Sequence, residues 1–163
     1  MNMNRFWKVL QFVSDKMKII GAACLVIMTF LTCIDVVGRF LRHPVFGSVE
    51  IMSFLGTFAV AMALPLTHEL KGHIGVEIVV TRFSRKVRAF IDLCTALISA
   101  GLFALVSWQM FEYSWKFKES GEVSMNLELP EYLIIFVVGC SFVVFTFIIF
   151  KEIIDILHIL RTK

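Results

Sequence analysis

The sequence predicts an all-α integral membrane protein with four transmembrane helices, preceded by a short N-terminal interfacial amphipathic helix. The 163 residues are 58% hydrophobic and only 18% charged, whereas about a quarter of the residues of a soluble domain are charged. The apolar residues gather in four blocks, each long enough, with its flanks, for the roughly 20 residues that cross a bilayer as a helix. A chain this short cannot bury four such helices in a soluble core.

The chain is predicted to form a single membrane domain, 1–163, whose helices follow these blocks in order. A backbone in lipid must satisfy its own hydrogen bonds, so each block is expected to be helical. The predicted spans are about 19–41, 49–67, 86–115 and 131–151, and residues 152–163 are expected to form a cytoplasmic helical tail.

Residues 4–18 show the pattern of an amphipathic helix. Phe6, Leu10 and Met17 share one helical face, and the lysines of this segment lie mostly opposite. Trp7 and the lysines suit a headgroup boundary. The pattern favours a helix lying in the cytoplasmic interface, and a solvated extension of the first span is the alternative.

Loop charges predict the orientation of the chain. Twelve of the sixteen Lys and Arg residues lie before the first span, in the second loop or in the tail, and four lie on the other side. Basic residues stay in the cytoplasm, so both termini are expected there. The net charge of +3 follows from the same bias and does not imply nucleic acid as a partner. A cleaved signal peptide is not expected, because the first apolar block starts late and is long.

The sequence offers no convincing catalytic, metal or cofactor site. All four cysteines lie inside apolar blocks, and no pair has the spacing of a redox or zinc motif. The segment HELKGH is similar to a zinc-protease helix. However, His68 and His73 are five positions apart instead of four, so they would not share one metal ion. We therefore expect no catalytic residue, no metal ligand and no cofactor in this chain.

The spans lack the features of a carrier that works alone. Such a carrier needs an ionisable group inside the membrane, and the deepest candidates, Asp35 and Asp92, lie near span ends. This favours an accessory or scaffold subunit over a proton-coupled exporter or the membrane anchor of a redox enzyme, which remain alternatives. An alanine stripe on the third span allows close helix approach, within the bundle or on a partner. It consists of Ala96, Ala100 and Ala104.

Charges crowd into DVVGRFLRHPVFGSVE, between the first two spans. Asp35 and Arg39 are four positions apart, so an ion pair is expected. Pro44 ends the helix or forces a turn. Ser48 is expected to cap the next helix, and Glu50 falls in its first turn, where the helix dipole favours an acid. One interpretation is a tight hairpin pinned by charges, and the other is that Arg39 and Glu50 hold a partner protein.

In the order and spacing of its landmarks, the chain resembles the small membrane subunit, of the DctQ type, of tripartite ATP-independent periplasmic (TRAP) transporters. The resemblance covers about residues 19–145 and lies in the sequence of landmarks across four helices more than in any one motif. The landmarks are Arg39, Pro44, Gly47 and Glu50, then GHIGVEIVV at 72–80, RKVRAFID at 85–92, Trp108, and finally Gly121, Ser124, Leu127 and Pro130.

The resemblance implies a role in the bacterial inner membrane. A periplasmic binding protein would capture an organic acid, and a large permease subunit of about a dozen spans would move it inward by a sodium-driven elevator motion. This chain would scaffold that large subunit, which is where sodium binding is expected. The candidate partner or structural contacts are Asp35, Arg39, Pro44, Gly47, Glu50, His73, Asp92, Gly121, Ser124 and Pro130.

Overall fold

The computed structural model describes residues 3–69 and 85–161. The helices of these ranges are α1 (Met3–Phe40), α2 (Ser48–Glu69), α4 (Arg85–Ser120) and α5 (Glu131–Arg161). Each of the four contains a segment long and apolar enough to cross a membrane. The predicted all-α membrane fold with four spanning helices is therefore confirmed within the described ranges.

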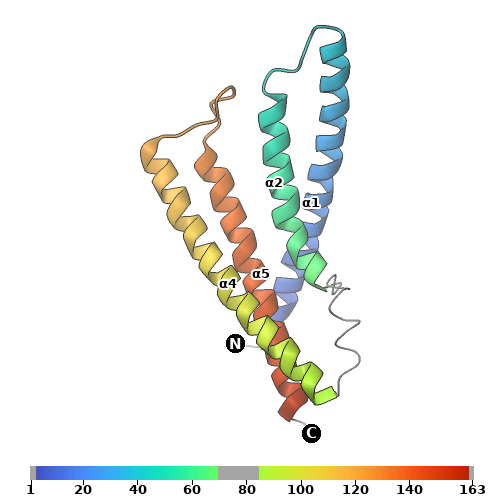
Figure 1. Ribbon diagram of the computed structural model, residues 1–163, viewed down its shortest axis with the longest axis vertical. Helices are drawn as coiled ribbons and strands as arrows, with labels where there is room; N and C mark the ends of the chain where they lie inside the picture. Colours follow the sequence, from blue (N-terminus) through green and yellow to red (C-terminus); the bar gives the residue numbers. More distant parts are fainter. Residues whose placement is uncertain (1–2, 70–84, 162–163) are drawn as a thin grey trace.

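The helices form two antiparallel hairpins, one of α1 with α2 and one of α4 with α5 (Figure 1). The hairpins meet chiefly where α2 packs on α5, and α1 also touches α5. The α1–α2 turn and the α4–α5 loop lie at one end of the molecule, which we call the hairpin end. Both chain termini lie toward the opposite end, which we call the terminal end.

No break separates residues 4–18 from the first span, so the separate interfacial helix that was predicted is not formed. Instead, α1 is one helix of 38 residues. The apolar face of its first turns is covered by protein. Leu10 and Met17 are buried, and Leu10 shares a small cavity with His68 of α2 and Ile148 of α5. The chain thus adopts the alternative, an extension of the span, with one face packed on neighbouring helices.

The core of buried side chains lies between α4 and α5, nearer the terminal end. Ala96 of α4 packs with Phe145, Ile149 and Ile153 of α5, and Ile149 is fully buried. Leu64 of α2 packs against this cluster, so the core also joins the two hairpins. Ala96 belongs to the predicted alanine stripe, whose first member therefore serves packing within the bundle.

Two buried serine side chains of α4 donate hydrogen bonds to backbone oxygens of α5. Ser107 Oγ lies 3.2 Å from the Gly139 oxygen, and Ser114 Oγ lies 2.8 Å from the Tyr132 oxygen. Hydroxyl groups that bond across helices favour helix association in lipid. These bonds hold α4 and α5 in register toward the hairpin end.

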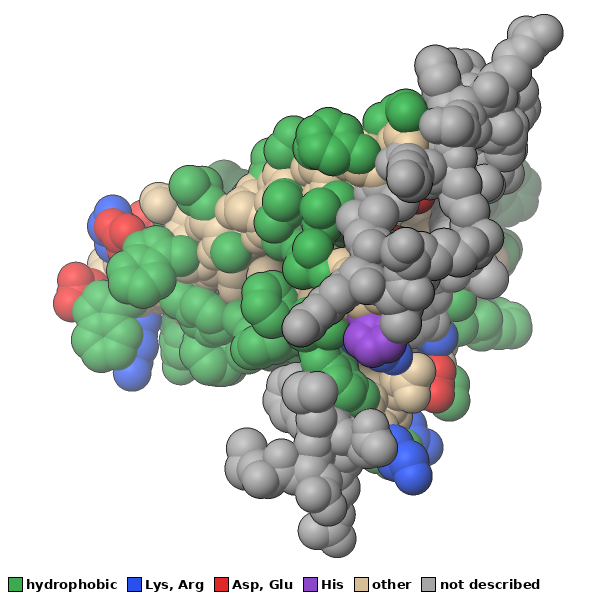
Figure 2. All heavy atoms as spheres, turned by 90° about the horizontal axis from the view of Figure 1, so that it is seen from below, with side chains coloured by type: hydrophobic (Ala, Val, Ile, Leu, Met, Phe, Trp, Pro, Cys, Tyr) green, Lys and Arg blue, Asp and Glu red, His purple; other side chains and the backbone are tan. Residues whose placement is uncertain are grey.

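The outer surface of the bundle is largely apolar. Seen from the terminal end, hydrophobic side chains cover much of the described surface (Figure 2). Phe30 of α1 and Ile98 and Leu105 of α4 are among the large exposed side chains. A surface of this kind is suited to lipid or to the spans of a partner and not to water.

Candidate functional site

The candidate site is the group of polar side chains at the hairpin end, beginning with Asp35 near the end of α1. Asp35 is buried, with 3% of its surface exposed. Its Oδ2 accepts a hydrogen bond from Arg39 Nε at 2.7 Å, as the spacing of four predicts. Its Oδ1 accepts a hydrogen bond from the Val45 N–H at 3.0 Å. One carboxylate therefore fixes both the end of α1 and the turn that follows.

The turn after α1 is entered through a left-handed residue, Arg42, with φ of 61°. The His43 N–H donates to the Gly38 oxygen at 2.7 Å, and the Arg42 N–H donates to the Arg39 oxygen at 3.1 Å. This bonding pattern is the Schellman helix end. A Cβ on Gly38 would lie 2.5 Å from the His43 oxygen, so the turn requires glycine there. Pro44 follows directly, where it cannot continue the helix.

Ser48 does not cap α2, contrary to the prediction. The Gly47 oxygen accepts the first helical hydrogen bond, from the Ile51 N–H at 3.1 Å, which makes Gly47 the cap residue. Ser48 is buried near the Asp35 carboxylate. The buried acid of α1 therefore lies close to the start of α2.

Glu50 connects α2 to the α4–α5 loop. Its Oε1 accepts hydrogen bonds from the Asn126 N–H at 2.8 Å and from Asn126 Nδ2 at 2.6 Å. Its Oε2 accepts a third bond, from the Leu127 N–H at 3.1 Å. Bonds to an ionised acceptor are about twice as strong as neutral ones. This carboxylate therefore joins residues that lie 76 positions apart in the chain.

An apolar contact accompanies these bonds. Gly47 has φ of 70°, and a Cβ built on it would lie 2.6 Å from the Leu127 side chain. The leucine thus occupies the space that a side chain at position 47 would need. Leu127 is held from both sides, by the Glu50 carboxylate at its backbone and by Gly47 at its side chain.

The α4–α5 loop closes on itself around Ser124, which is buried. The Ser124 N–H donates to the Leu129 oxygen at 3.0 Å, and Ser124 Oγ accepts from the Leu129 N–H at 3.1 Å. Val123 and Pro130 pair as an isolated antiparallel bridge, and α5 begins directly after Pro130. The closed loop presents the neighbouring N–H groups of Asn126 and Leu127 to α2.

The structure places most of the sequence-predicted site residues at the hairpin end. Gly121 is there as well, ending α4 with φ of 70°. Arg39 is bonded to Asp35, and Glu50 is bonded to the α4–α5 loop, so the two residues hold different segments. Asp92 is exposed on α4, away from this end. His73 lies outside the described residues.

Two residues of the site were not found by sequence reasoning. Gly38 has a local signal, because it lies one turn before a His-Pro pair that must leave the helix. Asn126 has no local signal, because its partner Glu50 is distant in the sequence. Only the packing of the two hairpins brings Asn126 to the carboxylate.

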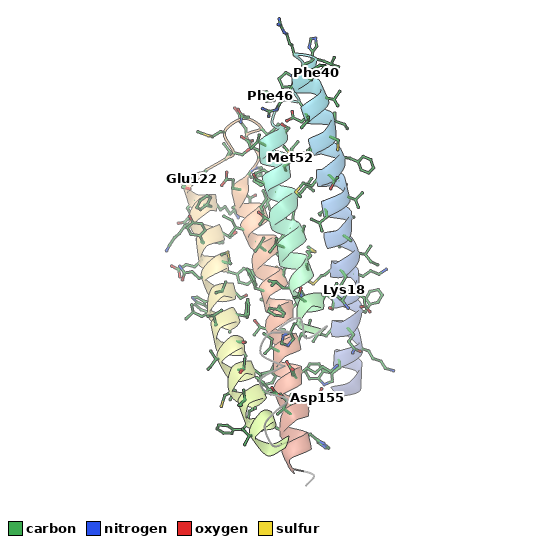
Figure 3. All side chains as sticks on the ribbon, turned by 45° about the vertical axis from the view of Figure 1, so that its right-hand side comes forward. Lys18, Phe40, Phe46, Met52, Glu122 and Asp155 are labelled. Atoms are coloured by element: carbon green, nitrogen blue, oxygen red, sulfur yellow. The ribbon has the colours of Figure 1, made fainter. Side chains whose placement is uncertain are left out.

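Large apolar side chains project around these polar groups. Phe40 is 87% exposed, Phe46 is 71% exposed, and Met125 in the loop is 97% exposed. Figure 3 shows Phe40 and Phe46 at the tip of the α1–α2 hairpin. The Arg39 side chain is 56% exposed, although its Nε is bonded to Asp35. The hairpin end therefore combines a fixed backbone with accessible apolar and cationic groups, a combination suited to recognising a partner.

The polar groups of the site bind neighbouring segments of the chain to one another. Within residues 3–69 and 85–161, no three His, Cys, Asp or Glu side chains converge as metal ligands would. The carboxylates of Asp35 and Glu50 are engaged by N–H groups and by Arg39.

The described chain is a small multi-pass membrane protein with four spanning helices, in which the start of α2 is bonded to the α4–α5 loop. The chain belongs to the family of the DctQ component of tripartite ATP-independent periplasmic transporters, whose family model matches residues 28–158. The match confirms the resemblance inferred from the landmarks. No curated protein and no solved structure matches the chain.

Replacing Gly47 by alanine is expected to destabilise the protein more than replacing Gly121 by alanine. Both glycines have φ of 70°, so each alanine would adopt a left-handed conformation at a cost of about 1–2 kcal/mol. At Gly47 the new Cβ would also collide with Leu127, whereas Gly121 has open space. That collision should add about 1–3 kcal/mol.

The free energy of unfolding in detergent, followed by circular dichroism, measures this difference. Leu127→Ala in the Gly47→Ala background should recover part of the extra loss, because it removes the colliding atoms. Equal losses for the two glycine variants would show that Leu127 does not occupy this space.

The variant Glu50→Gln is expected to loosen the α4–α5 loop. Its amide offers one acceptor oxygen in place of two, so one set of N–H donors loses its partner. Hydrogen exchange at the Asn126 and Leu127 amides should become about tenfold faster, measured by mass spectrometry of the protein in lipid nanodiscs. Glu128→Gln, which alters an exposed acid of the same loop, is the matched control. Unchanged exchange in Glu50→Gln would mean that the loop keeps its shape without the carboxylate.

Proposed function

We propose that this chain is the small membrane subunit that scaffolds the large permease subunit of a TRAP transporter. The family match over residues 28–158 is the observation that carries the proposal. In this proposal a periplasmic binding protein delivers an organic acid, and the large subunit moves it by a sodium-coupled elevator motion. The chain itself performs no catalysis.

The ionisable groups of the chain support a scaffold role over a carrier role. A carrier needs a charged group inside the membrane that can exchange its partners during transport. Asp35 is committed to Arg39 and to the turn, and Glu50 is committed to the loop. Both acids also lie at the hairpin end. We therefore assign sodium coupling to the large subunit.

In the proposed orientation, the hairpin end faces the periplasm and both termini lie in the cytoplasm. The distribution of Lys and Arg supports this, because twelve of the sixteen belong to segments at the terminal end or to the connection between the hairpins. The exposed loop around Met125 would then be accessible to the periplasmic binding protein.

Arg39 is the residue of the hairpin end that we propose contacts the large subunit. Its Nε is bonded to Asp35, which leaves both terminal nitrogens of the guanidinium for a partner, and its side chain is half exposed. Phe40 and Phe46 provide apolar surface close by in the chain. Glu50 acts indirectly in this proposal, by setting the shape of the α4–α5 loop.

The orientation is tested by labelling single cysteines in a variant whose four native cysteines are replaced. Ser120→Cys at the hairpin end and Asp155→Cys at the terminal end both alter exposed positions. A membrane-impermeant maleimide added to intact spheroplasts should label the first and spare the second. Labelling of Asp155→Cys alone would reverse the proposed orientation.

The function is tested by co-purification of the tagged chain with the large subunit and by sodium-driven uptake in vesicles. Arg39→Ala should weaken assembly by about a hundredfold or more if the guanidinium is buried against the partner, and by less than about tenfold if it stays exposed. We expect the larger effect. The matched control is Lys116→Ala, which removes an exposed cation of α4 near the hairpin end.

Glu50→Ala should assemble less well than the parent, because its loop is no longer held. If Arg39→Ala and Glu50→Ala both assemble and transport like the parent, neither residue serves the partner. If the parent chain co-purifies with no multi-span permease, the scaffold function itself is wrong.

A further inference from the structure

A charged surface lies on α1 at the terminal end, far from the site described above. Lys8, Phe12 and Lys16 follow one another at intervals of four residues, so they lie on one face of the helix. All three side chains are exposed. On the opposite side of the helix, Leu10 and Met17 are buried against the bundle. We call the exposed side, with Lys8, Phe12 and Lys16, the basic face of α1.

The two cations of the basic face are separated by apolar groups. The Lys16 ammonium lies 5.3 Å from the centre of the Phe12 ring. Phe12 is 62% exposed, and Val9 nearby is 59% exposed. Exposed apolar and basic groups alternate in this way where a helix meets the headgroups of a bilayer, because lysine stems cover apolar surface while their charges reach outward.

The packing of α1 on α2 gives the depth of Lys16 in the membrane. A Cβ on Gly21 of α1 would lie 3.3 Å from the Met62 Cβ of α2, so these two residues are level with one another. The two helices are antiparallel, and Lys16 is as far along α1 from Gly21 as Thr67 is along α2 from Met62. Thr67 directly precedes the end of the spanning segment of α2. Figure 3 likewise shows Lys18 on α1 at the level of the last turns of α2.

A contact with α5 gives the depth of the first turns of α1. The Lys151 ammonium lies 5.9 Å from the centre of the Trp7 ring, and Lys151 directly follows the apolar run of α5. Tryptophan is also enriched at membrane–water interfaces. The basic face, which runs from Lys8 to Lys16, therefore lies at the headgroup level of one leaflet.

The charges of this part of α1 favour an anionic ligand. Between Trp7 and Gly21, the charged residues are Lys8, Asp15, Lys16 and Lys18, which give three positive charges and one negative charge. The Asp15 carboxylate lies 3.0 Å from the Lys18 ammonium. A net positive charge therefore remains on α1 at headgroup level.

The acids of α5 lie on the other side of α1. Glu152 and Asp155 line a cavity together with Leu10, which is on the side of α1 that faces the bundle. A helix is about 10 Å across, and exposed charges are largely screened beyond about 10 Å at 0.1 M salt. These acids therefore do not cancel the charge of the basic face.

We propose that the basic face of α1 binds anionic phospholipids, such as phosphatidylglycerol, in the leaflet at the terminal end. The lipid phosphates lie beside the Lys8 and Lys16 ammonium groups, and the glycerol and first methylene groups contact Phe12 and Val9. Lipid bound in this way fixes how deeply the start of α1 sits in the bilayer. The proposal does not depend on the transport function.

Native mass spectrometry of the full chain, released from detergent after incubation with defined lipids, tests the proposal. Phosphatidylglycerol should be retained about fivefold more than phosphatidylcholine at equal concentration, because one lysine near the headgroups contributes about that factor toward an anionic lipid. Phosphatidylethanolamine, which is also neutral overall, should be retained like phosphatidylcholine. Equal retention of the three lipids, or retention of phosphatidylethanolamine as strong as that of phosphatidylglycerol, would overturn the proposal.

Variants locate the binding. The double variant Lys8→Ala with Lys16→Ala should lose the preference for phosphatidylglycerol, and Lys8→Arg with Lys16→Arg should keep it, because the charges remain. The matched control is Lys116→Ala with Lys118→Ala, which removes two exposed cations of α4 near the hairpin end and should also keep the preference. Circular dichroism verifies that the variants stay folded. A preference that survives in the folded Lys8→Ala, Lys16→Ala variant, or is lost equally in the control, would overturn the proposal.

Salt and a soluble competitor test the nature of the ligand. More ammonium acetate during the incubation should reduce the preference, because the screening length falls from about 10 Å at 0.1 M to about 3 Å at 1 M. Glycerol 3-phosphate at the concentration of the lipid should not displace it, because this anion lacks the acyl chains. A preference that does not change with salt, or displacement by glycerol 3-phosphate at equal concentration, would contradict binding of an anionic lipid.

Discussion

One carboxylate holds the two hairpins of this protein in register at the hairpin end. Glu50 belongs to the first turn of α2, and the N–H groups that it accepts belong to the loop between α4 and α5. Hydrogen bonds between Ser124 and Leu129 fold the loop on itself. The hydrogen bonds that join this loop to α2 are accepted by Glu50. Gly47 completes the arrangement, because only the absence of a side chain there leaves room for Leu127.

The sequence was sufficient for what depends on hydropathy and local spacing. Four apolar blocks predicted four spanning helices, and the interval of four residues predicted the pair of Asp35 with Arg39. The sequence could not decide the form of residues 4–18, because an apolar helical face looks the same whether it lies on lipid or on α5. Tertiary packing at Leu10 and Met17 decided it. The partner of Glu50 was likewise beyond reach, because it depends on how the two hairpins meet.

The contacts between the hairpins change in character along the bundle. Polar contacts lie at the two ends, where Glu50 reaches Asn126 and where His68 meets Glu152. Between them, α2 and α5 leave an apolar groove beside Val60 and Phe142. This distribution follows from the solvent, because a charged group is far cheaper to place near headgroups and water than at the centre of a bilayer.

The distance in sequence between Glu50 and its partners constrains how the protein matures. The α1–α2 hairpin leaves the ribosome first, and at that stage the Glu50 carboxylate can only be hydrated. The Asn126 and Leu127 amides reach it once α4 and α5 have both entered the bilayer and moved against α2. Insertion of the individual spans and docking of the hairpins are thus separate stages. Formation of the bonds to Glu50 marks the completion of the second stage.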